Sequence, residues 1–167
     1  MAILTKYEIL AEIERGHLKI MPFNGKNLGP ASLDLTLDNK WRIFSKKKKI
    51  TVDEDVDYKA TTKLVEKDKI ILKPGQLVLG ITKERISLPE NLTGWLQGRS
   101  RFARIGLSVH VTASFVQPGS DNKQVLEIIN LGPHTLVLKA GSKIAQLILQ
   151  RTEGKARYSG KFSDQEL

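Results

Sequence analysis

The pattern of hydrophobic and polar positions changes character near residue 18. Before it, the apolar residues Ile9 and Ile13 recur at helical spacing and fall on one face of a helix. Thr5 and Glu8 have the spacing of a capping box, in which each side chain satisfies a backbone N–H of the other residue. The pattern therefore predicts one short amphipathic helix, over residues 5–15.

From residue 18 onward, short alternating or wholly apolar runs are separated by Gly, Pro, Asn and Asp. This alternation is typical of antiparallel strands that bury one face. The expected strands cover 32–37, 41–44, 70–72, 77–82, 93–97, 106–111, 124–130, 135–138 and 144–151. We therefore expect a mainly β fold in which residues 1–167 form a single domain.

Two stretches depart from the strand pattern. Residues 38–69 are the least apolar, and we expect them to form an extended excursion rather than a second domain. Residues 152–167 are rich in Gly, Ser, Lys and Glu and show little periodicity. Such a segment is typical of a frayed terminus or of a flexible segment that orders over a ligand, and the pattern does not separate the two.

Composition agrees with a folded domain of ordinary size. Of the 167 residues, 40% are hydrophobic and 27% are charged, which is typical of a soluble globular protein with its own core. No apolar run approaches the roughly 18 residues that a membrane-spanning helix needs, and the first residues lack the apolar stretch of a signal peptide. We therefore expect a cytoplasmic protein with no membrane partner.

Positive charge narrows the class of partner. Lys and Arg number 27 against 18 Asp and Glu, and the net charge of +9 favours an anion such as nucleic acid, nucleotide or phosphate. Aromatic residues make up only 6%, which gives little support to a surface that stacks bases. The densest basic run, 46–49, is followed by acidic residues at 53–57, so we expect a solvated loop there rather than a binding patch.

The chain contains no cysteine, which excludes a disulfide framework, a thiolate nucleophile and Cys-ligated zinc. The zinc-deaminase signature HxE…PCxxC is therefore absent, and so are the GxxxxGK[ST], GxSxG, HExxH and GxGxxG motifs. The three histidines, His17, His110 and His134, are far apart in sequence, and we do not expect them to form a metal triad.

A cluster of basic residues follows the expected strand 93–97. Arg99, Arg101 and Arg104 lie within six residues, with Ser100 among them. Arginine forks match phosphate oxygens bidentately, and a hydroxyl adds a further donor. The cluster therefore indicates a phosphate-binding segment, and the alternative is a helical turn whose arginines face solvent.

Two carboxylates stand among apolar residues in expected strands. Glu127 is flanked by Leu126 and Ile128, and Asp34 lies between Leu33 and Leu35. A carboxylate on a buried face can take a proton from water and pass it on, whereas one on the other face simply points to solvent. The alternation alone leaves both readings open.

Several short blocks occur in one order along the chain. They are GPASLDLTL at 29–37, GRSRFARIGL at 98–107, VHVTA at 109–113, PG at 118–119, VLE at 125–127 and KFSDQ at 161–165. Together they resemble the dCTP deaminase branch of the dUTPase-like superfamily, over nearly the whole chain. The resemblance implies a dUTPase-like distorted jelly roll, also called a β-clip, with a short N-terminal helix. It also implies a homotrimer with active sites between subunits, and Mg²⁺ bound through the triphosphate of a nucleotide substrate.

The resemblance implies a role for each matching residue. Arg99 and Ser100 would bind phosphates, with the Ser100 hydroxyl also near the attacking water. Arg104 would stabilise charge near the cytosine, the Ala113 backbone would help to place the water, and Glu127 would be the general base and acid. Without zinc to acidify water, a carboxylate must take the proton as water attacks the base.

The C-terminal block would close over the substrate. By resemblance, Tyr158, Lys161 and Gln165 contact the triphosphate, which makes 152–167 a flexible C-terminal lid. The substrate is then a small molecule, dCTP or dUTP, and not a nucleic acid.

Two positions depart from the family pattern. Arg101 stands where a second Ser is usual, and Gln117 stands where Asp usually precedes Pro-Gly. Both stay among the expected substrate-binding residues, but a neutral Gln117 is a poor base, which weakens diphosphatase activity more than deamination. We therefore expect deamination of dCTP to dUTP and ammonia. The alternatives are a dUTP diphosphatase, an enzyme that does both, and a non-catalytic nucleotide-binding module.

Overall fold

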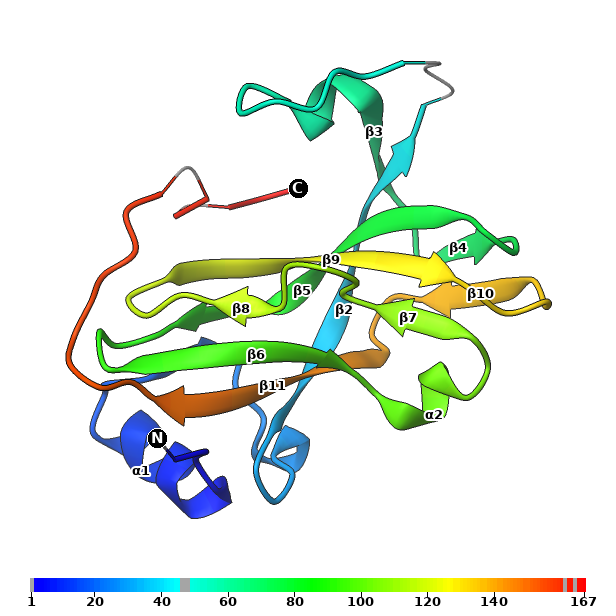
Figure 1. Ribbon diagram of the computed structural model, residues 1–167. Helices are drawn as coiled ribbons and strands as arrows, with labels where there is room; N and C mark the ends of the chain where they lie inside the picture. Colours follow the sequence, from blue (N-terminus) through cyan, green and yellow to red (C-terminus); the bar gives the residue numbers. More distant parts are fainter. Residues whose placement is uncertain (1, 46–48, 161, 164) are drawn as a thin grey trace.

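Strands dominate the computed structural model, which describes residues 2–45, 49–160, 162–163 and 165–167, and they curl around one core (Figure 1). The elements in chain order are α1 (Lys6–Glu14), β1 (Lys19–Met21), η1 (Gly25–Asn27), β2 (Leu33–Phe44), η2 (Tyr58–Thr61), β3 (Thr62–Glu66), β4 (Lys69–Leu72), β5 (Leu77–Ser87), β6 (Leu92–Gly98), α2 (Ser100–Ala103), β7 (Leu107–Val109), β8 (Phe115–Val116), β9 (Asp121–Asn130), β10 (Leu136–Lys139) and β11 (Lys143–Arg151). The predicted mainly β fold with a short N-terminal helix is confirmed.

One curled sheet carries most of the strands. Its order is β7-β9-β5-β2-β11-β6-β8, with β1 paired to β5 and β3 paired to β2, while β4 and β10 form a separate two-stranded sheet. Leu33, Leu35 and Leu37 alternate along β2 and are fully buried, because residues two apart share one face of a strand. The apolar alternation of the sequence therefore builds the core.

Several strand boundaries differ from those expected. The ranges 32–37 and 41–44 belong to the single strand β2, which is bulged against β5 between Leu37 and Trp41. The expected strand 106–111 shortens to β7, and the strands β1, β3 and β8 were not expected. These three have two to five residues each and bury few side chains, so they leave too little periodicity to detect.

Helix α1 begins at the predicted position but without the predicted cap. The Thr5 side chain makes no capping hydrogen bond, so the capping-box prediction was wrong. The buried Glu12 carboxylate instead ties the helix to β11, with Oε1 lying 2.9 Å from Arg151 Nη2. Burial raises the pKa of Glu12, but its hydrogen bonds with Arg151 and His17 outweigh this effect, and the pKa lies below its usual value.

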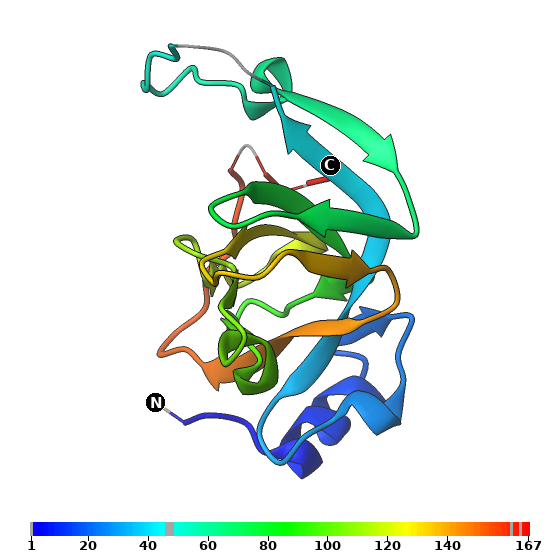
Figure 2. The same cartoon turned by 90° about the vertical axis from the view of Figure 1, so that its right-hand side faces the viewer.

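Part of the expected excursion is present among the described residues, where the end of β2, η2 and β3 project beyond the other strands (Figure 2). Lys49 is exposed, while the rest of the 46–49 run lies outside the described residues. The C-terminal tail rises along one side and ends beside the excursion (Figure 1), where Tyr58 Oη donates to the Glu166 carbonyl at 3.1 Å. No helix among the described residues is long and apolar enough to cross a membrane.

Candidate active site

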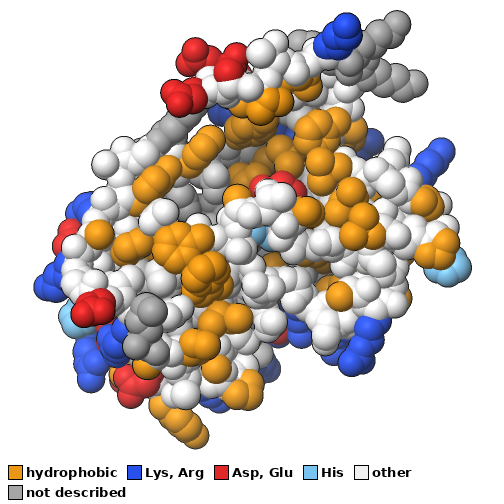
Figure 3. All heavy atoms as spheres, viewed as in Figure 1, with side chains coloured by type: hydrophobic (Ala, Val, Ile, Leu, Met, Phe, Trp, Pro, Cys, Tyr) orange, Lys and Arg blue, Asp and Glu red, His pale blue; other side chains and the backbone are white. Residues whose placement is uncertain are grey.

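A cavity of about 520 Å³ opens between β8, β9, the excursion and the C-terminal tail. Apolar side chains surround a hollow on the face seen in Figure 3, where acidic and histidine atoms are visible. The lining residues are Phe44, Tyr58, Leu79, His110, Ala113, Phe115, Val116, Gln117, Ser120, Asn122, Gln124, Val125, Glu127, Tyr158, Phe162 and Gln165. Among these described residues Glu127 is the only carboxylate, and none is Lys or Arg.

Glu127 lies on the cavity face of β9 and meets a buried histidine. Its neighbours Leu126 and Ile128 point into the core, so the alternation turns Glu127 toward the cavity, with 28% of its side chain exposed. Its Oε2 atom lies 3.1 Å from Nδ1 of His110, whose side chain is only 4% exposed. Neither atom hydrogen-bonds to any other described residue.

The other ring nitrogen of His110 fixes how this pair can hold a proton. Nε2 lies 2.7 Å from the Ala113 carbonyl oxygen, and because a carbonyl only accepts, Nε2 must carry a hydrogen. In a neutral ring Nδ1 would then face the Glu127 carboxylate with a lone pair. Nδ1 and Oε2 can therefore form a hydrogen bond with each other only when one proton lies between them.

The backbone places His110 against β9. Its N–H donates to the Glu127 carbonyl at 2.8 Å, and its φ of +61° lies in the left-handed region that few non-glycine residues adopt. This turn directs the chain from β7 toward Ala113, whose carbonyl receives the ring hydrogen. Strain of this kind is common where a side chain is held for function.

Amide side chains connect the cavity to the tail. Gln124 Nε2 donates to Asn122 Oδ1 at 2.7 Å, and Asn122 Nδ2 donates to the Phe162 carbonyl at 2.8 Å. Gln165 Nε2 donates to the Lys123 carbonyl at 3.0 Å, and the Tyr158 N–H donates to the Pro118 carbonyl at 2.9 Å. The tail therefore follows the rim of the cavity formed by its own chain.

Five of the predicted site residues line this cavity: Glu127, Ala113, Gln117, Tyr158 and Gln165. The prediction for Lys161 falls outside the described residues.

Tyr58, in the excursion, lines the cavity although the sequence assigned it no role. The centroid of its ring lies 5.4 Å from the Arg42 guanidinium. Burial raises the pKa of Tyr58 by more than Arg42 lowers it, so its hydroxyl stays protonated and able to donate.

The predicted arginine residues do not line the cavity of their own chain. Arg99 precedes α2 and is held by Asp34, with Nη2 lying 3.1 Å from Oδ2, and its Nη1 donates to the Lys143 carbonyl at 3.0 Å. Ser100, Arg101 and Arg104 are exposed around α2, at the end of the sheet away from the tail (Figure 1). Within one chain, the Glu127 carboxylate and the expected phosphate-binding segment therefore lie apart.

His110 belongs to the candidate site, but the sequence assigned it no role. It lies in the block VHVTA that carries part of the resemblance. A histidine between two valines gave no sign of a left-handed backbone or of a contact with Glu127, 17 positions later. No group of three or more His, Cys, Asp or Glu gathers among the described residues.

Comparison with known proteins connects this arrangement to a family. A family model described as dCTP deaminase-like matches residues 3–152. A "dCTP deaminase, dUMP-forming" of Streptomyces coelicolor is 36% identical over 98% of this chain and 91% of its own length. A protein of the same name from Mycolicibacterium vanbaalenii is 37% identical over 93% of this chain and 84% of its own length.

A solved structure shares the fold. The 2'-deoxycytidine 5'-triphosphate deaminase of Agrobacterium tumefaciens superposes with a TM-score of 0.71 at 20% identity and covers 90% of this chain. The match spans about half of that chain, 48% of its length. The match of the family model over most of the sequence and the identity with the two curated relatives show that this chain belongs to the dCTP deaminase-like family.

Proposed function

We propose that this chain catalyses the hydrolytic deamination of dCTP, with Glu127 as general base and acid. The observation that carries the proposal is the contact of Glu127 with His110 inside the cavity, because this pair can hold and move one proton. The names of the curated relatives support the substrate. The chain has no cysteine to supply the ligands of the zinc deaminases, so we propose a reaction that needs no zinc.

In the proposed reaction, water attacks C4 of the cytosine and Glu127 takes its proton. Glu127 delivers this proton to N3, then takes the remaining proton of the attacking water from the C4 hydroxyl and passes it to the departing ammonia, so that dCTP and water yield dUTP and ammonia. His110 keeps its Nε2 hydrogen on the Ala113 carbonyl and presents Nδ1 to the carboxylate, which holds Glu127 oriented toward the cavity. The Ala113 backbone and the Ser100 hydroxyl are proposed to position the water.

The triphosphate is proposed to bind between two subunits of a homotrimer. The cavity of one chain has no Lys or Arg among its described lining residues, yet a triphosphate needs cations. Arg99, Ser100 and Arg104 of a neighbouring subunit would supply them, and Arg104 would also stabilise charge near the cytosine. Mg²⁺ would enter with the nucleotide as part of the substrate.

Other predicted residues complete the proposed substrate site. Arg101 would add a further cation beside the phosphates, and Gln117 would hydrogen-bond the sugar. Tyr158, Lys161 and Gln165 would close over the bound nucleotide, so that residues 152–167 act as a flexible lid.

Formation of dUMP is a second candidate, and the names of the curated relatives favour it because they specify dUMP-forming enzymes. Loss of pyrophosphate needs a further activated water. Glu127 is the only carboxylate among the described lining residues, and the neutral Gln117 stands where an aspartate would be the base. The chemistry of the cavity therefore favours dUTP as the product.

A product assay tests both candidates. Ammonia and pyrophosphate are measured from dCTP and from dUTP, side by side, with Mg²⁺ present. Ammonia from dCTP without matching pyrophosphate supports the proposal, and equal amounts of the two products support formation of dUMP. Pyrophosphate from dUTP with no ammonia from dCTP would overturn the proposed deamination.

A further inference from the structure

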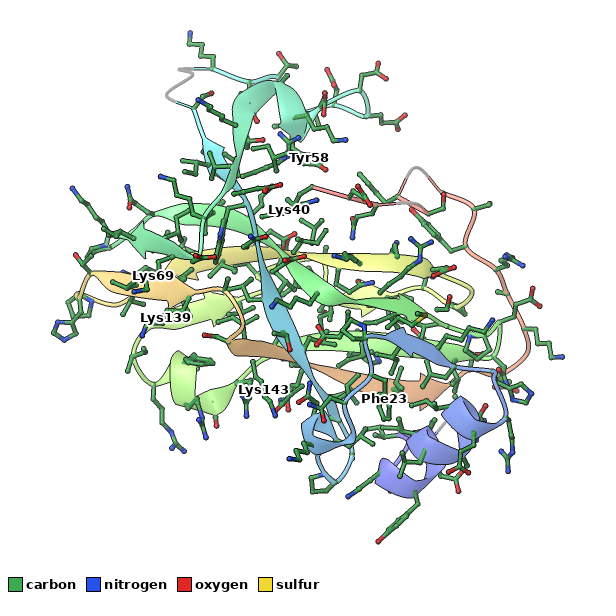
Figure 4. All side chains as sticks on the ribbon, turned by 180° about the vertical axis from the view of Figure 1, so that it is seen from behind. Phe23, Lys40, Tyr58, Lys69, Lys139 and Lys143 are labelled. Atoms are coloured by element: carbon green, nitrogen blue, oxygen red, sulfur yellow. The ribbon has the colours of Figure 1, made fainter. Side chains whose placement is uncertain are left out.

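The two-stranded sheet of β4 and β10 presents a charged and apolar face that nothing described in the chain covers. Lys69 lies directly opposite Lys139 in the register, and Ile71 lies opposite Val137. Ile71 is 64% exposed and Val137 is 54% exposed. Figure 4 shows Lys69 and Lys139 on these neighbouring strands. We call these four residues the basic face.

The basic face is unfavourable in an isolated chain. Like charges directly opposite on paired strands repel, and exposed β-branched side chains leave apolar area in water. No ion pair within the described part of the chain includes Lys69 or Lys139. A partner with carboxylates beside apolar side chains would relieve both costs.

The excursion carries such a segment, which we call the acidic turn, residues 50–57. Its sequence, ITVDEDVD, places four carboxylates beside Ile50, Val52 and Val56. Val52 is 89% exposed, and the carboxylates form no ion pair among the described residues. The acidic turn therefore complements the basic face in both charge and apolar character.

The two surfaces lie on different sides of one chain. In Figure 1 the acidic turn occupies the upper left and the sheet of β4 and β10 lies at the right. Because the two surfaces lie apart in one chain, a contact between them joins two copies of the chain.

We propose that the acidic turn of one subunit docks on the basic face of the next subunit. Contacts between two different surfaces of one chain close into a ring when the rotation permits. This inference rests on the homotrimer proposed above and gives the otherwise unexplained excursion a role: it clamps the neighbour whose α2 completes the cavity.

Charge reversal tests the docking through the state of association. Sedimentation velocity is measured for wild type, for Lys69→Glu with Lys139→Glu, for Asp53→Lys with Asp55→Lys, and for all four changes together. We expect each pair to weaken association at least about tenfold, and the fourfold variant to recover it, because opposite charges again face each other. Wild-type association should also weaken as salt shortens the screening length from about 10 Å at 0.1 M to about 3 Å at 1 M.

A matched control changes the same amount of charge elsewhere. Lys6→Glu with Lys26→Glu alters two exposed lysines near the N-terminal helix and should sediment as wild type. If neither the charge reversals nor salt changed the association of the trimer, the docking would be overturned and the proposed reaction would stand. Lys69 and Lys139 would then serve only to prevent edge-to-edge aggregation. A monomeric wild type that still deaminates dCTP would overturn the docking and the interface site together.

Discussion

At the scale of single residues, the candidate site is built around the contact between His110 and Glu127. The Nε2 hydrogen of His110 is committed to the Ala113 carbonyl, so its Nδ1 and the Glu127 carboxylate face each other at 3.1 Å. Two lone pairs at that distance repel, and one proton between them removes the repulsion. The same proton is the one that a deaminase must collect from water and return.

Glu127→Gln should abolish deamination while the nucleotide still binds. The amide keeps the shape of the side chain but cannot take a proton from water, so we expect turnover to fall by about 10²–10⁴-fold. Ammonia release measures turnover, and calorimetric titration with dCTP measures binding. Glu66→Gln, on the exposed strand β3, is the matched control and should behave as wild type. A fully active Glu127→Gln would remove Glu127 from the proposed reaction.

His110→Asn tests whether the histidine positions Glu127. Asparagine tolerates the left-handed backbone at this position but supplies no imidazole to share the proton, so kcat should fall at least about tenfold with little change in KM. The pH profile of kcat should also change, which a purely structural role would not cause. His134→Asn, at an exposed histidine, serves as control. An unchanged pH profile with a raised KM would contradict the positioning role.

At the scale of elements, α1 is attached to β11 by a buried ion pair, and this attachment should depend on pH. The pKa of Glu12 lies below its usual 4.5, so the charged form stabilises the fold above that value, and this contribution is lost as the pH falls through the lowered pKa. Glu12→Gln should reduce the free energy of unfolding at neutral pH by roughly 1–3 kcal/mol, because Arg151 loses its charge-assisted hydrogen bond to Glu12 and keeps its 3.4 Å contact with Glu8.

Urea unfolding at neutral pH and at a pH well below 4.5 measures this difference for Glu12→Gln. We expect the gap between wild type and variant to narrow at acid pH, where Glu12 is protonated in both the folded and unfolded states of wild type. Glu14→Gln changes an exposed carboxylate of the same helix and should match wild type throughout. If the difference in the free energy of unfolding between wild type and Glu12→Gln did not change with pH, the ion pair would not be the cause of that difference.

The elements also show which strands the hydrophobic periodicity of the sequence can predict. The long strands β2, β9 and β11 contain the alternating or apolar runs from which strands over 32–37, 41–44, 124–130 and 144–151 were predicted. The two-residue strand β8 has no such signal, although it brings Phe115 and Val116 to the cavity. The Thr5 cap failed because backbone and tertiary contacts hold the start of the helix without it: the Lys6 N–H donates to the Pro30 carbonyl at 2.8 Å.

At the scale of the whole molecule, only part of the candidate site predicted from the sequence motifs comes together in one chain. Glu127, Ala113 and Gln117 come from separate positions and line one cavity. The position of His110 could not be predicted, because it follows from a left-handed turn and a contact between β7 and β9. Arg104 does not line this cavity, and in the proposed function a neighbouring subunit supplies it.

Mixing two inactive variants tests whether two neighbouring subunits contribute residues to each site. If each site takes Glu127 from one subunit and Arg104 from the next, Glu127→Gln and Arg104→Ala should each be inactive alone. A mixed trimer would contain some sites in which the Glu127→Gln subunit supplies Arg104 and the Arg104→Ala subunit supplies Glu127. A ring of three subunits that contains both variants has one intact site in three, so about a third of wild-type ammonia release should return.

The variants must share trimers for this recovery to appear, so they are co-expressed with different affinity tags and purified through both. The control is the two separately purified variants, mixed just before the assay, which should stay inactive if subunits exchange slowly. Mixed trimers that carry both tags and remain inactive would show that Glu127 and Arg104 act from the same chain. In that case α2 would have to move across its own subunit to the cavity, although the Asp34 carboxylate and the Lys143 carbonyl hold Arg99, the residue just before α2, in place.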